Sequence, residues 1–269
     1  MNTLYHSPKK SLGQNFLTSI PARIAIVEAG EITPSDTILE VGPGKGFLTK
    51  AILDTGAHIV ALEKDRDLLP LLSENFSSFI DTKHLTLIEG DVLTFDPSAN
   101  NLKKGAYKLI ANIPYYITGA ILSHFLTSTH HPSLMVVLVQ KEVAERVCAR
   151  DKKESLLSLS VKAYGEPKLV YKVNKGSFFP IPTVDSAVLK ISAISKKNFA
   201  NAKAEQLFFD LIHAAFAHKR KFALSNIKGV FKEHDITALF EELGISEKVR
   251  AEDVTLETWL QLSSKLATQ

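Results

Sequence analysis

Three glycines at alternating positions, Gly42, Gly44 and Gly46, have the spacing in this chain that most directly suggests ligand binding. They follow a short apolar run, residues 38–41, that is typical of a buried parallel strand, and they precede a helix-compatible run, residues 47–53. Because glycine has no Cβ, the backbone can turn tightly there and approach a ligand closely. Strand, glycine turn and helix together predict a nucleotide-like ligand at the end of a sheet: NAD, a nucleoside triphosphate or S-adenosylmethionine.

Two acidic residues at the ends of later strands support this prediction. Residues 57–63 predict a second buried strand that ends on Glu63, about 20 residues after the first glycine, where a carboxylate can accept hydrogen bonds from both hydroxyls of a ribose. Residues 85–92 predict a third strand that contains Asp91, a short acid that could accept a bond from an adenine amino group. Alone, Asp91 is weak evidence, because Gly-Asp is also common turn chemistry.

The residues around the glycines separate the three ligands. A triphosphate loop requires Ser or Thr after Gly-Lys, but Lys45 is followed by Gly46. A dinucleotide fingerprint requires its third glycine where this chain has Phe47. The remaining form, E-x-G-x-G-x-G over residues 40–46, resembles the S-adenosylmethionine loop of class I methyltransferases. S-Adenosylmethionine is therefore the expected cofactor, and an NAD-dependent oxidoreductase is the alternative that calorimetry with the two ligands would distinguish.

The segment Asn112-Ile113-Pro114-Tyr115 points to the chemistry. It resembles the (N/D/S)-(I/L/P)-P-(Y/F) motif of methyltransferases that act on exocyclic amino groups of bases. The amino nitrogen of adenine is a poor nucleophile, because its lone pair is delocalised into the ring. Acceptance of its two N–H groups by the Asn112 side-chain oxygen and the Ile113 carbonyl would hold the nitrogen in line with the methyl donor. Tyr115 can stack on the base, as enzymes that act on flipped bases require.

Strands and helices alternate through most of the chain, which places these residues at strand ends. Further strands are expected at residues 107–111, 134–139, 168–173 and 187–194. After residues 195–198 only helical patterns follow. We therefore expect an α/β fold with a class I, Rossmann-like methyltransferase sheet in residues 1–195, and a small all-helical C-terminal domain in residues 196–269.

Composition limits the class of protein. The 269 residues are 45% hydrophobic and 23% charged with a net charge of +3, so a surface for a polyanion must come from local clusters such as Lys9-Lys10 and residues 218–221. The single cysteine, Cys148, excludes an internal disulfide, and no metal site is expected. Residues 134–139 are too few to cross a bilayer, and residues 1–14 lack the apolar centre of a secretory signal, so we expect a cytoplasmic protein without a membrane partner.

The motifs stand in the order found in the ribosomal RNA adenine dimethyltransferase family, KsgA type, and the chain resembles that family over nearly its whole length. The resemblance is carried by residues 14–17 (Gln-Asn-Phe-Leu), the glycine turn, Glu63, Asp91, residues 112–115, residues 178–186 and the basic helical segment 216–226. The resemblance implies cofactor contacts at Asn15, Leu17, Gly42, Glu63, Asp91 and Asn112, and Gly44 of the glycine turn is expected to bind the cofactor as well. It implies contacts with the target adenine at Asn112, Ile113 and Tyr115, with Phe178 on the other face of the base.

The family acts on small-subunit (16S) rRNA, where two adjacent adenines in a hairpin near the 3′ end each receive two methyl groups late in assembly of the 30S subunit. The resemblance therefore implies an S-adenosylmethionine-dependent dimethyltransferase, a monomer that binds rRNA within an assembling 30S particle and docks through its helical domain. An enzyme of the macrolide-resistance type that methylates large-subunit rRNA, and a non-catalytic assembly factor, remain alternatives. Residues 151–155 depart from the family, which usually has a turn with Gly and Tyr there.

Overall fold

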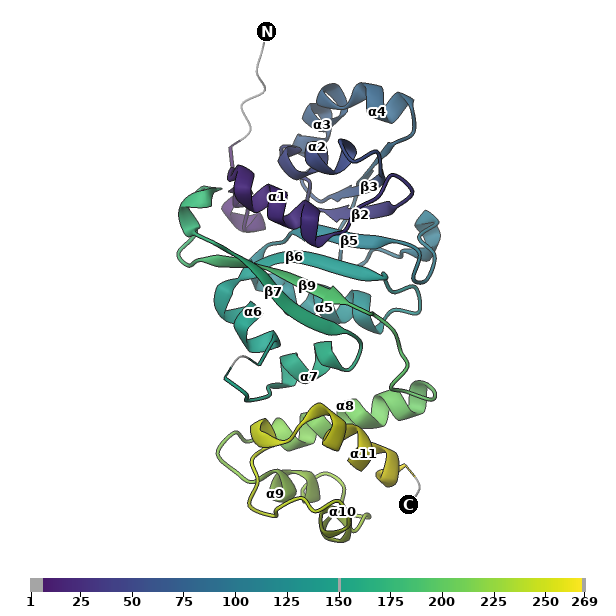
Figure 1. Ribbon diagram of the computed structural model, residues 1–269, viewed down its shortest axis with the longest axis vertical. Coiled ribbons are helices and arrows are strands. Elements are labelled where there is room, and N and C mark those ends of the chain that lie inside the picture. The colour runs from purple at the N-terminus through teal and green to yellow at the C-terminus, as the bar shows by residue number, and fades with distance from the viewer. Residues whose placement is uncertain (1–6, 150, 268–269) are drawn as a thin grey trace. The chain divides into compact units, whose positions relative to one another are not determined.

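The computed structural model describes residues 7–149 and 151–267, and the chain divides into two compact units (Figure 1). The first unit takes the chain up to Ala144 together with Gly165–Ile194. The second unit takes Glu145–Tyr164 together with the chain from Ser195 onwards.

Residues 145–164 are where the structure differs from the predicted domain boundaries, because the sequence had placed them in the methyltransferase domain. Tyr164, the last residue of this segment, donates its O–H to the carboxylate of Glu205 at 2.5 Å. Its ring also stacks on Phe209, with 5.9 Å between the ring centroids. These contacts with residues far along the chain draw the segment into the helical unit, whereas the boundary near residue 195 agrees with the change from strands to helices.

The first unit is built on a seven-stranded sheet with the order β4-β3-β2-β5-β6-β9-β7. The strands are β2 (Thr37–Val41), β3 (His58–Glu63), β4 (Leu85–Glu89), β5 (Lys108–Asn112), β6 (Leu134–Gln140), β7 (Glu166–Val173) and β9 (Ser186–Ser192). Neighbouring strands from β4 to β6 are parallel, and β9 is antiparallel to both β6 and β7. The strands lie within two residues of the predicted bounds, except that β4 ends at Glu89, three residues early, so that Asp91 follows the strand. The expected class I sheet is confirmed.

The strand order places a ligand crevice between β2 and β5. The chain leaves β2 toward β3 and β4 on one side, and it leaves β5 toward β6 on the other. Ligands of open α/β sheets bind at the carboxyl ends of strands where the winding direction reverses in this way. Gly42 directly follows β2, and Glu63 and Asn112 are the last residues of β3 and β5, so the predicted site residues surround this crevice.

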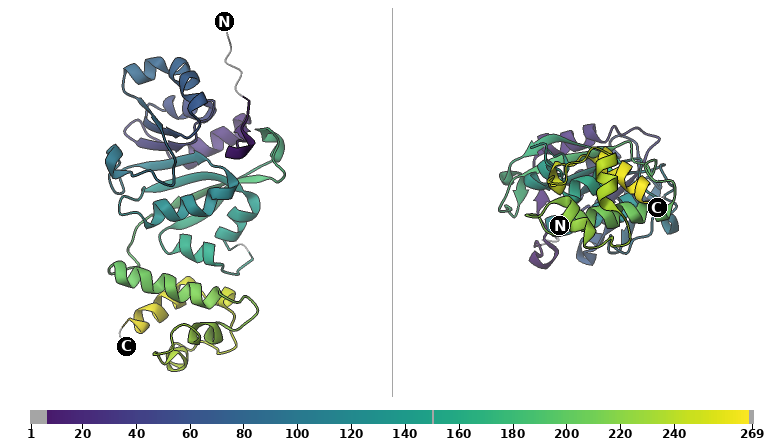
Figure 2. Two further views of the ribbon diagram at one scale, coloured as in Figure 1. Left: turned by 180° about the vertical axis from the view of Figure 1, so that it is seen from behind. Right: turned by 90° about the horizontal axis from the view of Figure 1, so that it is seen from below.

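Helices cover both faces of this sheet. The helices of the first unit are α1 (Ile20–Ala29), α2 (Phe47–Leu53), α3 (Leu69–Asn75), α4 (Ser77–Asp81) and α5 (Thr118–Thr127). The next helix, α6 (Lys141–Val147), begins in the first unit and ends in the second. Connections between parallel strands are right-handed, so α2 and α3 cover the face opposite to that covered by α5, as Figures 1 and 2 show. As expected for a strand covered on both faces, the first six residues of β6 are all buried.

A second, two-stranded sheet joins the N-terminal arm to the loop before β9. In it, β1 (Phe16–Leu17) pairs antiparallel with β8 (Phe178–Phe179), so that Phe16 lies opposite Phe179 and Leu17 lies opposite Phe178. This pairing connects two segments that are far apart in the sequence and sets them beside the carboxyl end of β2.

The second unit is all-helical, as the sequence predicts for the C-terminal part. Its helices after residue 145 are α7 (Leu156–Lys162), α8 (Ala202–Phe216), α9 (Ala223–Lys228), α10 (Ile236–Glu242) and α11 (Leu256–Leu266). Phe208, Phe240 and Trp259 are fully buried and form much of its core. In the part of the chain that the structure describes, no helix combines the length and apolar character needed to cross a membrane.

Candidate active site

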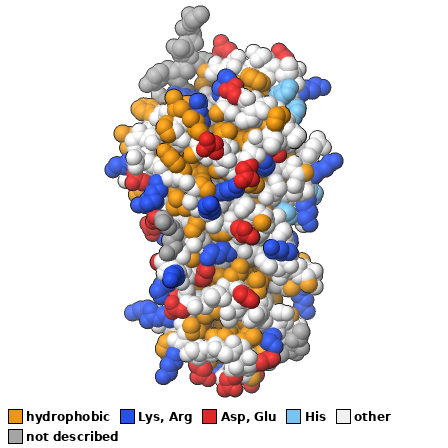
Figure 3. Space-filling model, in the orientation of Figure 1, with side chains coloured by type: hydrophobic (Ala, Val, Ile, Leu, Met, Phe, Trp, Pro, Cys, Tyr) orange, Lys and Arg blue, Asp and Glu red, His pale blue; other side chains and the backbone are white. Residues whose placement is uncertain are grey.

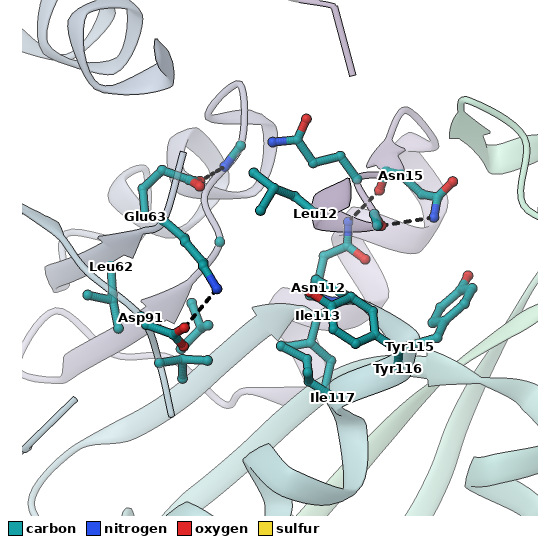
Figure 4. Close-up of a pocket in the computed structure, with 18 of the residues that line it drawn as sticks. Leu12, Asn15, Leu62, Glu63, Asp91, Asn112, Ile113, Tyr115, Tyr116 and Ile117 are labelled. Atoms are coloured by element: carbon teal, nitrogen blue, oxygen red, sulfur yellow. Dashed lines mark hydrogen bonds and ion pairs between the residues drawn. The ribbon is translucent and has the colours of Figure 1, made fainter. Parts of the chain in front are cut away.

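A cavity opens at the carboxyl ends of β2, β3, β4 and β5 (Figure 4). Its walls come from the N-terminal arm, the glycine turn, the ends of β3 and β4, and the turn after β5. The predicted site residues on these walls are Asn15, Gly42, Gly44, Glu63, Asp91, Asn112, Ile113 and Tyr115. The structure therefore brings together most of the residues that the sequence singled out. We call this the first cavity.

The glycine turn needs glycine for both conformation and space. Gly42, Gly44 and Gly46 have φ angles of 69°, 60° and 84°, in the left-handed region that residues with a Cβ rarely adopt. A Cβ on Gly46 would lie 2.4 Å from the ring of Phe76, a clash that requires the surroundings to move. Only a glycine turn can therefore pack this closely and leave the end of β2 open to a ligand.

Glu63 is held in place by backbone N–H groups. Its carboxylate accepts hydrogen bonds from the N–H of Gly44 (3.1 Å) and the N–H of Asp65 (2.8 Å). The residue is only 5% exposed, and this burial raises the pKa of the Glu63 carboxyl, an effect that the two N–H donors oppose. A fixed acceptor at the end of β3 matches the geometry that the hydroxyls of a ribose require.

Asp91 lies on the same wall, after β4. It pairs with the Lys64 ammonium at 2.7 Å and accepts the backbone N–H of Leu93 at 3.0 Å. Lys64 lowers the pKa of the Asp91 carboxyl, so the carboxylate stays ionised and is a strong acceptor for an amino group. Glu63 and Asp91 thus offer two carboxylates to the same cavity.

Asn112 connects β5 to the N-terminal arm. Its side-chain N–H donates to the carbonyl oxygen of Asn15 at 3.0 Å. In Figure 4 the side-chain oxygen of Asn112 points away from this bond. Since the amide nitrogen is held by the arm, the oxygen is the atom that Asn112 offers to an incoming N–H group.

The turn after β5 places two tyrosines side by side in the sequence but in different surroundings. Tyr115 is half-buried, and its hydroxyl is 2.6 Å from the hydroxyl of Ser186. Tyr116 is 66% exposed and also lines the first cavity. The sequence singled out Tyr115 alone, because the motif ends there, so Tyr116 is a wall residue that pattern reasoning missed.

The N-terminal arm is tied to the loop after β3 by an ion-pair network. The Lys9 ammonium pairs with Asp65 at 2.5 Å and with Asp67 at 2.6 Å, and the side-chain N–H of Gln14 donates to Asp65 at 2.8 Å. These ion pairs give Lys9 a structural role in the arm, whereas the sequence offered Lys9-Lys10 as a local cluster for a polyanion. The sequence did not predict this role of Asp65, because Lys9 and Gln14 lie more than fifty residues away from it.

A second cavity lies on the other side of the wall formed by Phe16, Gly42, Gly44 and Asn112. Its remaining walls are Leu17, Thr18, Pro43, Lys45, Phe47, Leu48 and Phe179. Leu17, a predicted cofactor contact, lines this cavity and not the first one.

Phe178, the predicted contact on the other face of the target base, is a core residue in this structure. It is 3% exposed, belongs to the hydrophobic core and lines neither cavity, whereas Phe179 lines the second one. The strand pairing explains this, since alternate residues of β8 face opposite sides. Contact between Phe178 and a target base stays a prediction, and it would require the core around this ring to open.

The fold and the first cavity define the class of protein, a class I S-adenosylmethionine-dependent methyltransferase. Two solved structures share the fold. One is the 23S rRNA methyltransferase ErmE, with a TM-score of 0.75 and 24% identity over 94% of this chain and 100% of that chain. The other is a dimethyladenosine transferase from Plasmodium falciparum, with a TM-score of 0.81 and 22% identity over 94% of this chain and 98% of that chain.

Sequence comparison identifies the family. The family model "Ribosomal RNA adenine dimethylase" matches residues 5–268. A protein of Dehalococcoides mccartyi named "Ribosomal RNA small subunit methyltransferase A" is 39% identical over 257 residues, 94% of this chain and 87% of the relative. A protein of the same name from Clostridium botulinum is 35% identical over 257 residues, 94% of this chain and 92% of the relative.

The chain belongs to the ribosomal RNA adenine dimethylase family. This confirms the family that the sequence motifs suggested, the enzyme class and the cofactor S-adenosylmethionine. It also excludes the NAD-dependent oxidoreductase.

Proposed function

We propose that the protein transfers methyl groups from S-adenosylmethionine to the N6 amino groups of two adjacent adenines in a hairpin near the 3′ end of small-subunit (16S) rRNA, during assembly of the 30S subunit. The names of its relatives from Dehalococcoides mccartyi and Clostridium botulinum support the small subunit as substrate. The residues of the first cavity support transfer to an amino group.

The hydrogen bond between Asn112 and the Asn15 carbonyl is the observation that carries the proposed chemistry. It directs the Asn112 oxygen to accept one N–H of the adenine amino group, while the Ile113 carbonyl accepts the other. Fixing both N–H groups aims the nitrogen lone pair at the methyl donor, and orientation of this kind contributes several kcal/mol to catalysis. The bound cofactor supplies a methyl group activated on a sulfonium sulfur.

Other groups of the first cavity assist without forming covalent bonds. Glu63 and Asp91 would hold the ribose and the adenine amino group of the cofactor. Tyr115, oriented by its bond to Ser186, would stack on the flipped target base. A general base is unnecessary, because the methylated amino group carries a positive charge and readily loses its proton to water.

We further propose that the helical unit docks on rRNA within the assembling 30S particle, where the protein acts as a cytoplasmic monomer. His218, Lys219, Arg220 and Lys221 after α8 are all exposed. The Asn226 side-chain N–H donates to the carbonyl oxygens of Ala215 (2.8 Å) and His218 (3.1 Å), which fixes this turn. A fixed, exposed group of cations suits a phosphate backbone.

Primer extension on both rRNAs after incubation with the protein and cofactor tests the proposal. Stops at two adjacent adenines near the 3′ end of small-subunit rRNA are expected. Modification of large-subunit rRNA alone would contradict the assignment and favour the macrolide-resistance type of enzyme. Binding to small subunits with no modification of either rRNA would favour an assembly factor without catalysis.

A further inference from the structure

We propose that the second cavity binds the nucleotide next to the target adenine, with the base stacked on Phe179 and its phosphate paired with Lys45. This inference rests on the proposed function, because it takes RNA as the substrate. It assigns a role to Lys45 and Phe179, which the methyl-transfer chemistry leaves unused.

The position of the second cavity makes it accessible to a neighbouring nucleotide. It shares the wall of Phe16, Gly42, Gly44 and Asn112 with the first cavity, so it begins at the residue that would hold the target amino group. Bases of single-stranded loops are unstacked at low cost, and consecutive bases of one strand can enter separate pockets. A strand whose adenine reaches Asn112 therefore brings an adjoining nucleotide to the second cavity.

The aromatic wall of this cavity suits a base. Phe179 is 54% exposed, although the pairing of β8 with β1 fixes its backbone opposite Phe16. Ile181 and Val184 in the same loop are 65% and 41% exposed, so the apolar surface continues beyond the cavity. Figure 3 shows hydrophobic side chains at the surface of the first unit in the region where Figure 1 places the segment between β7 and β9. Exposed aromatic rings on a fixed backbone are the usual stacking platforms for single-stranded RNA.

The charge at this cavity suits a phosphate. Lys45 is exposed, and its ammonium lies 5.2 Å from the centre of the Phe16 ring. Among the described residues, no ion pair involves Lys45, whereas Lys50 on α2 pairs with Asp54. The first cavity contains the carboxylates of Glu63 and Asp91, which would repel a phosphate. The charge of Lys45 therefore favours placing the RNA backbone on the side of the second cavity.

The test measures two affinities of the full chain and its variants, one for unmethylated small subunits and one for S-adenosylhomocysteine. Phe179→Ala and Lys45→Ala should each weaken binding of small subunits on the order of tenfold. Lys45→Ala should also reduce the slope of log affinity against log salt concentration by about 0.7, since one phosphate contact is lost. Phe179→Trp should bind as the wild type does, and calorimetry should find the affinity for S-adenosylhomocysteine unchanged in all three variants.

Matched control variants show whether the effect is specific to the second cavity, or whether loss of any nearby positive charge or apolar side chain weakens binding. Lys50→Ala removes an exposed lysine from α2, the helix that follows the glycine turn, and Val184→Ala removes an exposed apolar side chain from the loop that follows β8. Both should bind small subunits as the wild type does. Weakening by these two variants equal to that by Lys45→Ala and Phe179→Ala would overturn the inference.

Two further outcomes are decisive. Weaker binding of S-adenosylhomocysteine by Lys45→Ala or Phe179→Ala, with binding of small subunits unchanged, would assign the second cavity to the methionine end of the cofactor, where Leu17 lies. Unchanged binding of both ligands would also refute the inference. The proposed function fails separately, through absence of methylation by the wild type, and RNA binding by the variants remains measurable in that case.

Discussion

The two cavities on either side of Asn112 differ in the chemistry of their walls. In the first cavity, Glu63, Asp91 and Asn112 already make hydrogen bonds or ion pairs that fix the direction of their acceptor atoms. In the second, the walls contain apolar side chains such as Leu17, Phe47 and Phe179 and no carboxylate, and Lys45 makes no ion pair with the described residues. Fixed acceptors suit a small ligand that binds in one orientation, whereas an exposed ring and an exposed lysine suit one stretch of a flexible polymer.

Replacement of the residue in the shared wall should have the largest effect. Asn112→Ala removes one of the two acceptors for the target amino group, so kcat for methylation should fall by about a thousandfold. Binding to small subunits should be retained, because the second cavity and the helical unit are unchanged. Methylation within tenfold of the wild-type rate would show that Asn112 does not position the amino group.

A buried carboxyl behind the glycine turn predicts a pH dependence of stability. Glu40 is 1% exposed, and neither carboxyl oxygen has a hydrogen-bond partner among the described residues. Burial raises the pKa of Glu40 from its usual 4.5 to about 8; the neighbouring Thr49 hydroxyl opposes this rise, and the charge of Glu63 adds to it. Below pH 4.5 the carboxyl is neutral in both states. Between these two pKa values it ionises only in the unfolded chain, so stability falls as the pH rises.

The size of this effect follows from the difference in pKa. From pH 5 to pH 8 the free energy of unfolding should decrease on the order of 3 kcal/mol because of this group. Urea unfolding measures this decrease. In Glu40→Gln the part of the decrease that Glu40 causes should be absent, whereas Glu28→Gln, at an exposed position of α1, should show the same decrease as the wild type. Identical pH profiles for the wild type and Glu40→Gln would contradict the assignment of a neutral carboxyl at position 40.

Removal of a fixed acceptor from the first cavity should weaken binding of the cofactor and leave binding of RNA unchanged. Glu63→Ala should raise the Kd for S-adenosylhomocysteine about 10- to 100-fold, because hydrogen bonds to a charged acceptor contribute roughly 1.5–3 kcal/mol. Isothermal calorimetry measures this directly. Glu89→Ala, at the end of the neighbouring strand, removes an exposed partner of Arg66 and serves as the control. An equal rise in Kd for the two variants would mean that Glu63 does not bind the cofactor specifically.

Breaking the ion pairs that hold the N-terminal arm should have the smallest effect on binding of the cofactor. Lys9→Ala breaks ion pairs with Asp65 and Asp67, and Lys9 is itself 36% exposed in its side chain. Partly exposed pairs contribute about 0–1 kcal/mol, so the Kd for S-adenosylhomocysteine should rise at most about fivefold, and less at high salt. Calorimetry at two salt concentrations measures both effects. A larger rise in this Kd that does not depend on salt concentration would mean that Lys9 contacts the ligand and does not act through the arm.

The cavities also differ in how far the sequence could predict them. The first depends on residues at strand ends, and apolar runs followed by Gly42, Glu63, Asp91 and Asn112 indicate such ends locally. The second depends on the pairing of β1 with β8, and a two-residue strand has no detectable periodicity. The exposure of Phe179 and the burial of Phe178 both follow from that pairing.

Long-range contacts explain the other differences. The ion pair of Lys9 with Asp65 joins residues 56 positions apart, and neither has a local pattern that names its partner. Residues 145–164 follow the last parallel strand and have ordinary helical patterns, so nothing local assigns them to the helical unit. Contacts with residues far along the chain do so, among them the packing of Tyr164 on Phe209, its bond to Glu205 and the ion pairs of Lys153 with Glu252 and Asp253.

Mass spectrometry of rRNA fragments tests the central claim most directly. Unmethylated small subunits are incubated with the protein and a cofactor that carries an isotopically labelled methyl group, and the rRNA is then digested. We predict a fragment from near the 3′ end of the small-subunit rRNA that carries four labelled methyl groups, two on each of two adjacent adenines. Label confined to large-subunit rRNA, or no label in either rRNA, would contradict the account.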